Sequence, residues 1–241
     1  MAGHVSDSNG AGKASKSPVI LLALLAASLS LNVYLGLKVQ GTSPSGSPRA
    51  ESKLSAGANV PPVEASDLQG QKATITYADK GKPTVLYVFS PKCGWCSNNM
   101  ENIRTLSDAR KDSFSFVGLS LAGDKLEGYV NAHRLDMPVY QSPSSDALNT
   151  LGLGSTPQTI VISAEGKVIK NWIGAYTGEV QADVEKYFGL ELPGVADAQA
   201  SGAPSRCVTC LQDGREYSVG SKVKLGDAEV RCQENGQWAK L

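Results

Sequence analysis

The sequence has few histidines, few aromatic residues and no excess of either charge. Its two histidines, His4 and His133, are too far apart in the chain to build a histidine-based metal site. Lys plus Arg and Asp plus Glu number 23 each, so the formal net charge is zero. Non-specific electrostatic binding of nucleic acid needs a strongly basic surface. We therefore predict neither a metal site nor a nucleic-acid partner.

The N-terminal part of the chain predicts a single membrane anchor. Residues 1–17 are polar, whereas residues 18–38 form an apolar run that carries no charge before its final lysine. A helix of about 20 residues spans about 30 Å, the thickness of the hydrocarbon core of a bilayer. A cleaved signal peptide, the alternative, would have a shorter apolar core followed by small residues. Lys13 and Lys16 precede the run, which places the N-terminus in the cytoplasm and the rest on the exported side, periplasmic or extracellular.

Composition divides the exported part into four segments. Residues 39–61 are rich in small residues and proline and predict a flexible linker. In residues 62–190, short apolar runs alternate with segments whose apolar residues recur at helical spacing, and this pattern predicts one folded domain. Residues 191–206 form a second linker, and residues 207–241 form a small module with three of the five cysteines.

The segment 62–190 predicts an α/β domain in which helices cover a mixed sheet. Thr84–Ser90 is too short and too apolar for anything but a buried strand. After it, Cys96, Met100, Ile103 and Leu106 share one helix face. Further strands are expected at Phe114–Leu119, Met137–Gln141, Thr159–Ser163 and Lys167–Ile173, and further helices at 124–135, 145–151 and around 180–188.

The pair Cys93-Gly94-Trp95-Cys96 lies between the buried strand and the start of the helix. A cysteine at that point faces the free N–H groups of the helix, which stabilise a thiolate and make it the attacking sulfur. The second cysteine, one turn later, can attack the resulting mixed disulfide and release the partner. The alternative, half a zinc site, would need a second pair about 15–20 residues away, and the next cysteine is Cys207.

Thr156-Pro157 stands just before the strand Thr159–Ser163. Proline lacks a donor for the sheet and belongs at the start of a strand. A cis bond there would expose the backbone of Thr156 for pairing with an extended partner chain. An ordinary trans proline is the alternative, and most X–Pro bonds are trans.

KPTVLYVFSPKCGWCSNNM, followed by GLGSTPQTIVISAEGKVIKNWIGAYTGE, resembles the thioredoxin-like superfamily. More narrowly, it is similar to the membrane-anchored, exported thiol–disulfide oxidoreductases of the TlpA/ResA type. The resemblance implies a thioredoxin fold, a cis Thr156–Pro157 bond, Cys93 as nucleophile and Cys96 as resolving thiol. Gly94, Trp95, Thr156 and Pro157 complete the implied site, and no cofactor is required because the dithiol carries two electrons.

Two positions depart from the pattern of these relatives. Many carry Glu three residues after the second cysteine, where this chain has Asn99, and Tyr87 replaces the buried acid of thioredoxin. Either carboxylate could take a proton from the buried thiol, so the proton acceptor is not identified. The resemblance does not identify the redox partner or the direction of electron flow.

The C-terminal module carries Cys207, Cys210 and Cys232 and predicts small strands at 216–219, 222–225 and 229–232. Its CxxC follows a linker rather than a buried strand, so a second catalytic pair is not favoured. Loop entropy does not distinguish a Cys210–Cys232 bond from a Cys207–Cys232 bond. We expect Cys210–Cys232, with Cys207 free for intermolecular pairing or exchange.

The leading hypothesis is a membrane-tethered thiol–disulfide oxidoreductase that acts on exported protein thiols and disulfides together with a redox partner. The first alternative is a thiol peroxidase of the peroxiredoxin type, because Ser90 lies three residues before Cys93 as such enzymes require. The second is a redox-inert binding module held at the membrane.

Overall fold

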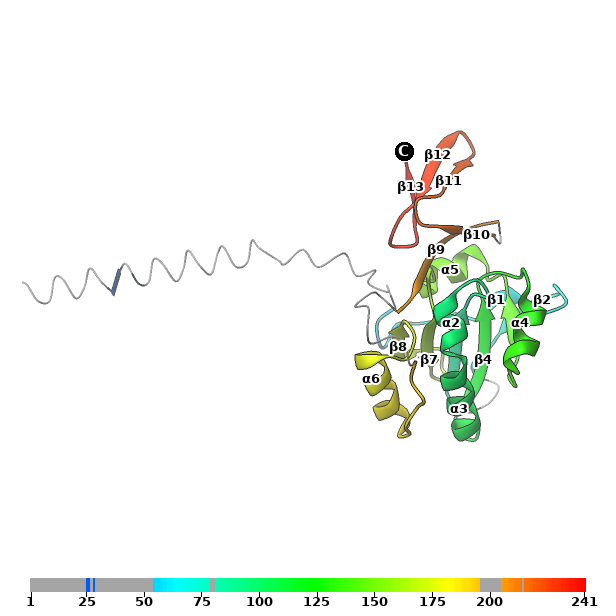
Figure 1. The fold of residues 1–241 in the computed structure, drawn as a ribbon, viewed down its shortest axis with the longest axis vertical. Helices are drawn as coiled ribbons and strands as arrows, with labels where there is room; N and C mark the ends of the chain where they lie inside the picture. Colours follow the sequence, from blue (N-terminus) through cyan, green and yellow to red (C-terminus); the bar gives the residue numbers. More distant parts are fainter. Residues whose placement is uncertain (1–24, 27, 29–53, 79–80, 196–204, 214) are drawn as a thin grey trace, which may run out of the picture. The chain divides into compact units, whose positions relative to one another are not determined.

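The computed structural model describes residues 25–26, 28, 54–78, 81–195, 205–213 and 215–241 (Figure 1). Leu25, Ala26 and Ser28 are helical, and the rest of the predicted anchor at 18–38 lies outside the described residues. No helix in the described part is long and apolar enough to cross a membrane. Most residues of the two predicted linkers also lie outside the described part.

Seven strands form the central sheet of the domain, in the order β2-β1-β5-β4-β3-β7-β8. The central strands β3, β4 and β5 are parallel, while β7 and β8 continue the sheet in antiparallel pairing beside β3. Their bounds are β1 Val63–Ser66, β2 Lys72–Ile75, β3 Thr84–Phe89, β4 Ser115–Ser120, β5 Val139–Gln141, β7 Gln158–Ile162 and β8 Val168–Ile173. The predicted mixed sheet is therefore confirmed.

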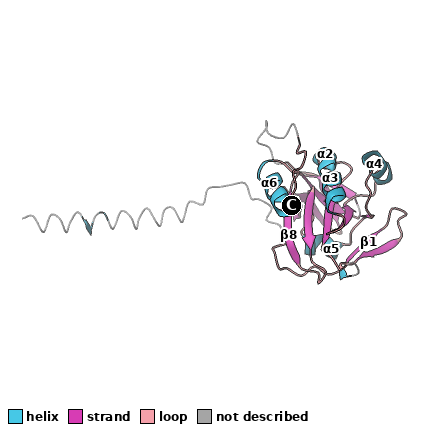
Figure 2. Ribbon diagram, turned by 90° about the horizontal axis from the view of Figure 1, so that it is seen from below, coloured by secondary structure: helices cyan, strands magenta, loops and turns pink. Residues whose placement is uncertain are grey.

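Helices cover both faces of this sheet (Figure 2). Alternate residues of β3 point to opposite faces, as a pleated strand requires: Val85, Tyr87 and Phe89 join one core, and Leu86 and Val88 the other. The first core packs against α2, α3, α4 and α6, and the second against α5. The helices are α2 Gly94–Asn98, α3 Met100–Arg110, α4 Leu126–His133, α5 Ser145–Leu151 and α6 Gly178–Phe188.

The sequence predictions for this domain differ from the structure in three places, of which the first is the short strand β6 Ser155–Thr156, which was not predicted. The hairpin of β1 and β2, antiparallel and at one edge of the sheet, was not predicted. The single helix expected after Cys93 is divided at Asn99, which ends α2 and precedes α3. The predicted helix face survives this division, because Cys96, Met100, Ile103 and Leu106 are all buried.

The C-terminal module, predicted at 207–241, consists of short antiparallel strands that begin at Cys207. Ser205 and Arg206, predicted as the end of the linker, directly precede the first strand, so the module is taken below as residues 205–241. Its strands are β9 Cys207–Gln212, β10 Arg215–Ser218, β11 Lys222–Leu225, β12 Ala228–Cys232 and β13 Trp238–Lys240. The last three form one small sheet, whereas β10 and β9 form another together with β6 Ser155–Thr156 of the preceding domain. The CxxC of the module lies within strand β9.

Candidate active site

Cys93 lies between β3 and α2, at the position that the sequence predicts. It is the residue that caps the N-terminus of α2, and its carbonyl oxygen accepts the backbone N–H of Cys96 at 3.0 Å. Its side chain is almost completely buried, with 2% of its surface exposed. Gly94 beside it is exposed, and Trp95 is half-buried against the first core. The CxxC thus begins the helix, as the interpretation of the motif requires.

Cys96 is the one cysteine of the chain that has no disulfide partner, and it is fully buried. Burial raises the pKa of its thiol to about 12, and the nearby Glu216 carboxylate adds to the rise. The backbone of Ser90 and the side chain of Thr156 act in the opposite direction. Cys96 is therefore a protonated thiol at neutral pH, held one helical turn from Cys93.

Thr156 and Pro157 lie directly beside this pair. Their peptide bond is cis, as the resemblance implies. The Cys93 sulfur lies 3.5 Å from the carbonyl oxygen of Thr156, and Thr156 is buried. Two segments far apart in the sequence, the CxxC and the turn before β7, therefore meet at one site.

The structure corrects the expected state of Cys207. Cys93 is bonded to Cys207, 114 residues later, rather than to Cys96. The expectation of a free Cys207 was wrong, and the CxxC holds no internal disulfide. The reason is spatial, because the strand that carries Cys207 enters the active site.

Strand β9 pairs antiparallel with β6, and this pairing brings Cys207 to Cys93. Cys207 stands opposite Thr156, and Val208 stands opposite Ser155. The backbone N–H of Thr209 extends the pairing by donating to the carbonyl oxygen of Gly154 at 3.0 Å. An extended chain therefore lies along the edge that precedes the cis proline, with its cysteine bonded to the first cysteine of the CxxC.

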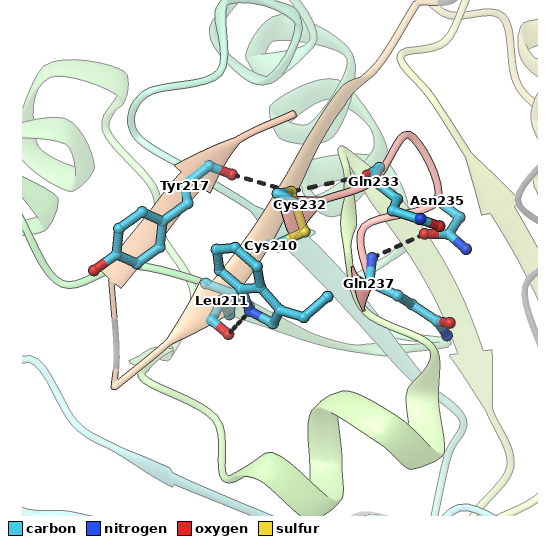
Figure 3. Close-up of a disulfide and its surroundings, with 8 residues drawn as sticks. Cys210, Leu211, Tyr217, Cys232, Gln233, Asn235 and Gln237 are labelled. Carbon is cyan, nitrogen blue, oxygen red and sulfur yellow. Dashed lines mark hydrogen bonds between the residues drawn. A yellow bond between two sulfur atoms is a disulfide. The ribbon is translucent and has the colours of Figure 1, made fainter. Parts of the chain in front are cut away.

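The second disulfide of the module joins Cys210 to Cys232, as predicted (Figure 3). Both residues are buried. Around them, the indole N–H of Trp238 donates to the carbonyl oxygen of Leu211 at 2.9 Å, and the Trp238 and Tyr217 rings meet edge to face. This bond links β9 to β12 and thereby joins the two small sheets of the module.

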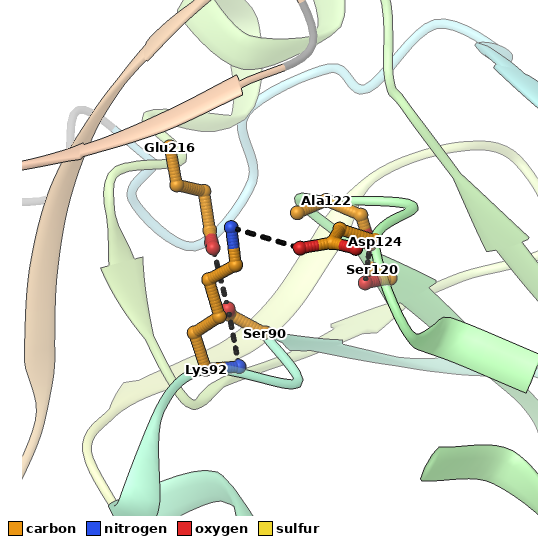
Figure 4. Close-up of polar contacts among 6 residues, drawn as sticks. All are labelled: Ser90, Lys92, Ser120, Ala122, Asp124 and Glu216. Carbon is orange, nitrogen blue, oxygen red and sulfur yellow. Dashed lines mark hydrogen bonds and ion pairs between the residues drawn. The ribbon is translucent and has the colours of Figure 1, made fainter. Parts of the chain in front are cut away.

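A carboxylate from the module also reaches the site (Figure 4). The hydroxyl of Ser90 donates to Oε2 of Glu216 at 2.8 Å, and the backbone N–H of Lys92 donates to the same hydroxyl at 3.1 Å. Burial raises the pKa of Glu216, while the hydrogen bond from Ser90 and the charge of Lys92 lower it. No sequence signal pointed to Glu216, because its strand is separated from Ser90 by more than a hundred residues.

The two positions that depart from the relatives carry no carboxylate in the structure. Tyr87 is buried with its hydroxyl unpartnered, and burial raises its pKa well above the usual value. Asn99 is buried, and its Oδ1 accepts the backbone N–H of Tyr176 at 2.9 Å and the side chain of Asn102 at 3.0 Å. Asn99 thus has a structural role where the helix divides.

The remaining polar residues add no second site. His133 packs its ring on Tyr129, with ring centroids 4.3 Å apart, and burial lowers its pKa. Within the described residues, no group of three or more His, Cys, Asp or Glu side chains could hold a metal ion.

Residues 55–188, more than half of the chain, match the Redoxin family. The chain belongs to that family. The ResA thiol-disulfide oxidoreductase of Bacillus thuringiensis is 25% identical over 165 residues, which cover 67% of this chain and 88% of the relative. ResA of Geobacillus thermodenitrificans is 27% identical over 164 residues, with coverage of 67% and 87%.

Among solved structures, the thioredoxin domain of a thiol-disulfide oxidoreductase from Bacteroides vulgatus matches with a TM-score of 0.47 and 21% identity. The match covers 56% of this chain and 99% of that domain. Together with the family, the relatives confirm the resemblance to ResA-type thioredoxin-like oxidoreductases. The chain is a thioredoxin-like oxidoreductase that carries an additional C-terminal module.

Proposed function

We propose that this chain is a membrane-tethered thiol–disulfide oxidoreductase that acts on exported protein thiols and disulfides. The observation that carries the proposal is the bonded pair of Cys93 and Cys207 beside Thr156. It places a cysteine of an extended chain on the first cysteine of a CxxC while the second stays free and buried. This is the arrangement that a mixed disulfide with a substrate requires.

In the proposed reaction, the Cys93 thiolate attacks a substrate disulfide, forms a mixed disulfide and releases one substrate thiolate. The Cys96 thiolate then attacks the Cys93 sulfur, so that the Cys93–Cys96 bond forms and the second substrate sulfur leaves. Two electrons pass from the dithiol to the substrate, and the reverse sequence oxidises a substrate dithiol. The potential of the couple relative to its compartment sets the direction.

The contacts of Ser90 favour this exchange over a thiol peroxidase. In the peroxidase hypothesis, the residue three positions before Cys93 serves the peroxide-reacting thiolate. Here the Ser90 hydroxyl donates to Glu216 instead. The disulfide of Cys93 with a strand paired to β6 also suits a polypeptide substrate better than a peroxide.

The tethering rests on residues 18–38, whose apolar run is long enough to span a bilayer. Relatives named ResA match 67% of this chain. If the anchor is retained, the full chain will fractionate with membranes and resist carbonate extraction. A mature form in the soluble exported fraction, starting near residue 29, would contradict it.

The catalytic part of the proposal is tested with purified full chain in an insulin-disulfide reduction assay. We expect turnover with the wild type and loss of it in Cys93→Ser. In the reduced protein, Cys93 is expected to alkylate much faster than Cys96, because only Cys93 lies at the helix N-terminus. Peroxide consumption without insulin reduction would instead identify a peroxidase, and equal alkylation rates would contradict the assigned roles.

A further inference from the structure

The C-terminal module occupies the position that a substrate would need. We propose that this module is a tethered partner of the thioredoxin-like domain, docked at the substrate edge of the oxidised enzyme, and that Cys207 is a third redox-active cysteine. The inference rests on the proposed function and adds to it an occupant of the site. The occupant is the chain's own residues 205–241.

The module pairs with the domain through backbone hydrogen bonds between β9 and β6. The module contributes Cys207 and Val208 opposite Thr156 and Ser155 of β6. The contact continues on both sides, because Thr209 donates to the carbonyl oxygen of Gly154 and the Ser205 carbonyl accepts the N–H of Ala175 at 2.8 Å. A disulfide alone would fix one point, whereas this pairing fixes the direction and register of the strand.

Glycines lie where the module and the domain approach each other most closely. A Cβ on Gly154 would lie 3.4 Å from Cα of Gly236, and one on Gly236 would lie 3.1 Å from Cα of Gly154. A Cβ on Gly174 would lie 2.9 Å from the hydroxyl of Ser205. A Cβ on Gly236 or Gly174 would therefore come closer to the opposite surface than a side chain normally does. A Cβ on Gly154 would be in ordinary contact, so only the outer atoms of a larger side chain there would push the surfaces apart. This close fit of backbone on backbone indicates a built interface.

Side chains of the module complete the closure of the site. Leu211 packs against the second core of the domain, and Cys207 packs against the first. Glu216 accepts the Ser90 hydroxyl three residues before Cys93. Because only 2% of the Cys93 side chain is exposed in this arrangement, an external thiol has little access to its sulfur.

The closed state can open without any external oxidant or reductant. The Cys96 thiol loses its proton, and the thiolate attacks the Cys93 sulfur. The Cys93–Cys96 bond forms, the Cys93–Cys207 bond breaks, and Cys207 leaves as a thiolate that takes up a proton. One disulfide replaces another, so the number of electrons in the chain is unchanged. The oxidised enzyme therefore has a closed and an open isomer.

The tether makes the module a strong competitor for the site. A linked segment meets its site at an effective concentration on the order of millimolar, well above that of a dilute protein substrate. A substrate must therefore displace the module from β6 before it reaches Cys93. Removing Cys207, or disturbing the contact at Gly154, should increase access to external thiols.

The test measures how fast the oxidised full chain forms a mixed disulfide with a synthetic extended peptide that carries one cysteine. The peptide thiolate attacks the Cys93 sulfur, and the thiolate of Cys207 or Cys96 leaves. Four proteins are compared: wild type, Cys207→Ser, Gly154→Val and the control Gly128→Val, whose Cβ would meet nothing within 4 Å. We expect Cys207→Ser and Gly154→Val to react at least about tenfold faster than wild type, with Gly128→Val unchanged. Peptide mapping of the wild type should recover the Cys93–Cys207 bond.

The outcomes separate this inference from the proposed function. Equal, measurable rates in all four proteins would overturn the tethered partner while leaving the oxidoreductase intact. A faster Cys207→Ser with Gly154→Val at the wild-type rate would overturn the docked arrangement. Absence of the mixed disulfide with the peptide in every protein, including Cys207→Ser, would contradict the oxidoreductase itself.

Discussion

Cys207 stands opposite Thr156 in the pairing of β9 with β6, and its sulfur is bonded to Cys93. One residue of the module therefore contacts both the first cysteine of the CxxC and the backbone edge beside it. The free thiol of Cys96 lies behind this bond, fully buried. The site is closed to other proteins when Cys93 is bonded to Cys207, and open when Cys93 is bonded to Cys96.

The first prediction concerns the resolving thiol. In a Cys96→Ser variant, no thiol inside the site can displace Cys207, so the Cys93–Cys207 bond should accumulate. Mixed disulfides with other proteins should instead accumulate in the double variant Cys96→Ser/Cys207→Ser, which keeps only Cys93 at the site. Non-reducing gels followed by peptide mapping distinguish the two. Equal amounts of partner adducts in the single and double variants would count against competition by Cys207.

Features that depend on nearby residues were predictable from the sequence. The spacing of three and four residues between Cys96, Met100, Ile103 and Leu106 predicts one face of a helix. These four residues are buried in the structure. The placement of the CxxC after β3 follows from the apolar run of that strand. The division of the helix at Asn99 was not predicted, and neither was the hydrogen bond of its side chain with Tyr176, far along the chain.

The meeting of the CxxC with Thr156 and Pro157 was implied by the resemblance, but the other contacts between distant segments were not predictable. Cys93 and Cys207 are 114 residues apart, and loop entropy changes so slowly with length that it hardly discriminates among pairings. The Cys210–Cys232 bond was expected correctly, although loop entropy did not distinguish it from a Cys207–Cys232 bond. Glu216 faces Ser90 only because β9 docks on β6, and nothing in the sequence around Glu216 encodes that docking.

A second prediction concerns the buried amide of Asn99. Replacing it with alanine removes the acceptor of the Tyr176 N–H, and a buried donor without a partner costs about 1–3 kcal/mol. We expect Asn99→Ala to lower the free energy of unfolding by about that amount in urea titrations. Asn98→Ala, at an exposed neighbouring position, is the matched control. Similar stabilities for the two variants would show that this hydrogen bond is not important for folding.

A third prediction concerns the disulfide between Cys210 and Cys232. Closing a loop of about 23 residues stabilises a fold by about 3 kcal/mol in the chain-entropy estimate, and the small module has few other sources of stability. Cys210→Ser/Cys232→Ser should therefore increase proteolysis and amide exchange within 205–241. The thioredoxin-like domain should remain protected.

The control for this experiment is Cys207→Ser, which leaves the Cys210–Cys232 bond in place. Equal protection of the module in the double variant and this control would show that the bond contributes little. Protection lost throughout the chain would instead show that the domain itself depends on the module.

The last prediction concerns the pH dependence of opening. Burial, together with the charge of Glu216, raises the pKa of Cys96 to about 12. Only the thiolate attacks, so the conversion of Cys93–Cys207 into Cys93–Cys96 should accelerate about tenfold per pH unit below that pKa. Acid quenching, alkylation and peptide mapping measure this rate across the pH range.

Glu216→Gln removes the negative charge and should lower the pKa of Cys96, so its rate should exceed that of wild type at neutral and alkaline pH. Below the pKa of Glu216 the wild-type carboxyl is also uncharged, so the two profiles should converge there. Glu229→Gln, at an exposed position of the same module, should follow the wild type. A Glu216→Gln variant that opens more slowly at every pH would show that this carboxylate instead accepts the proton of Cys96.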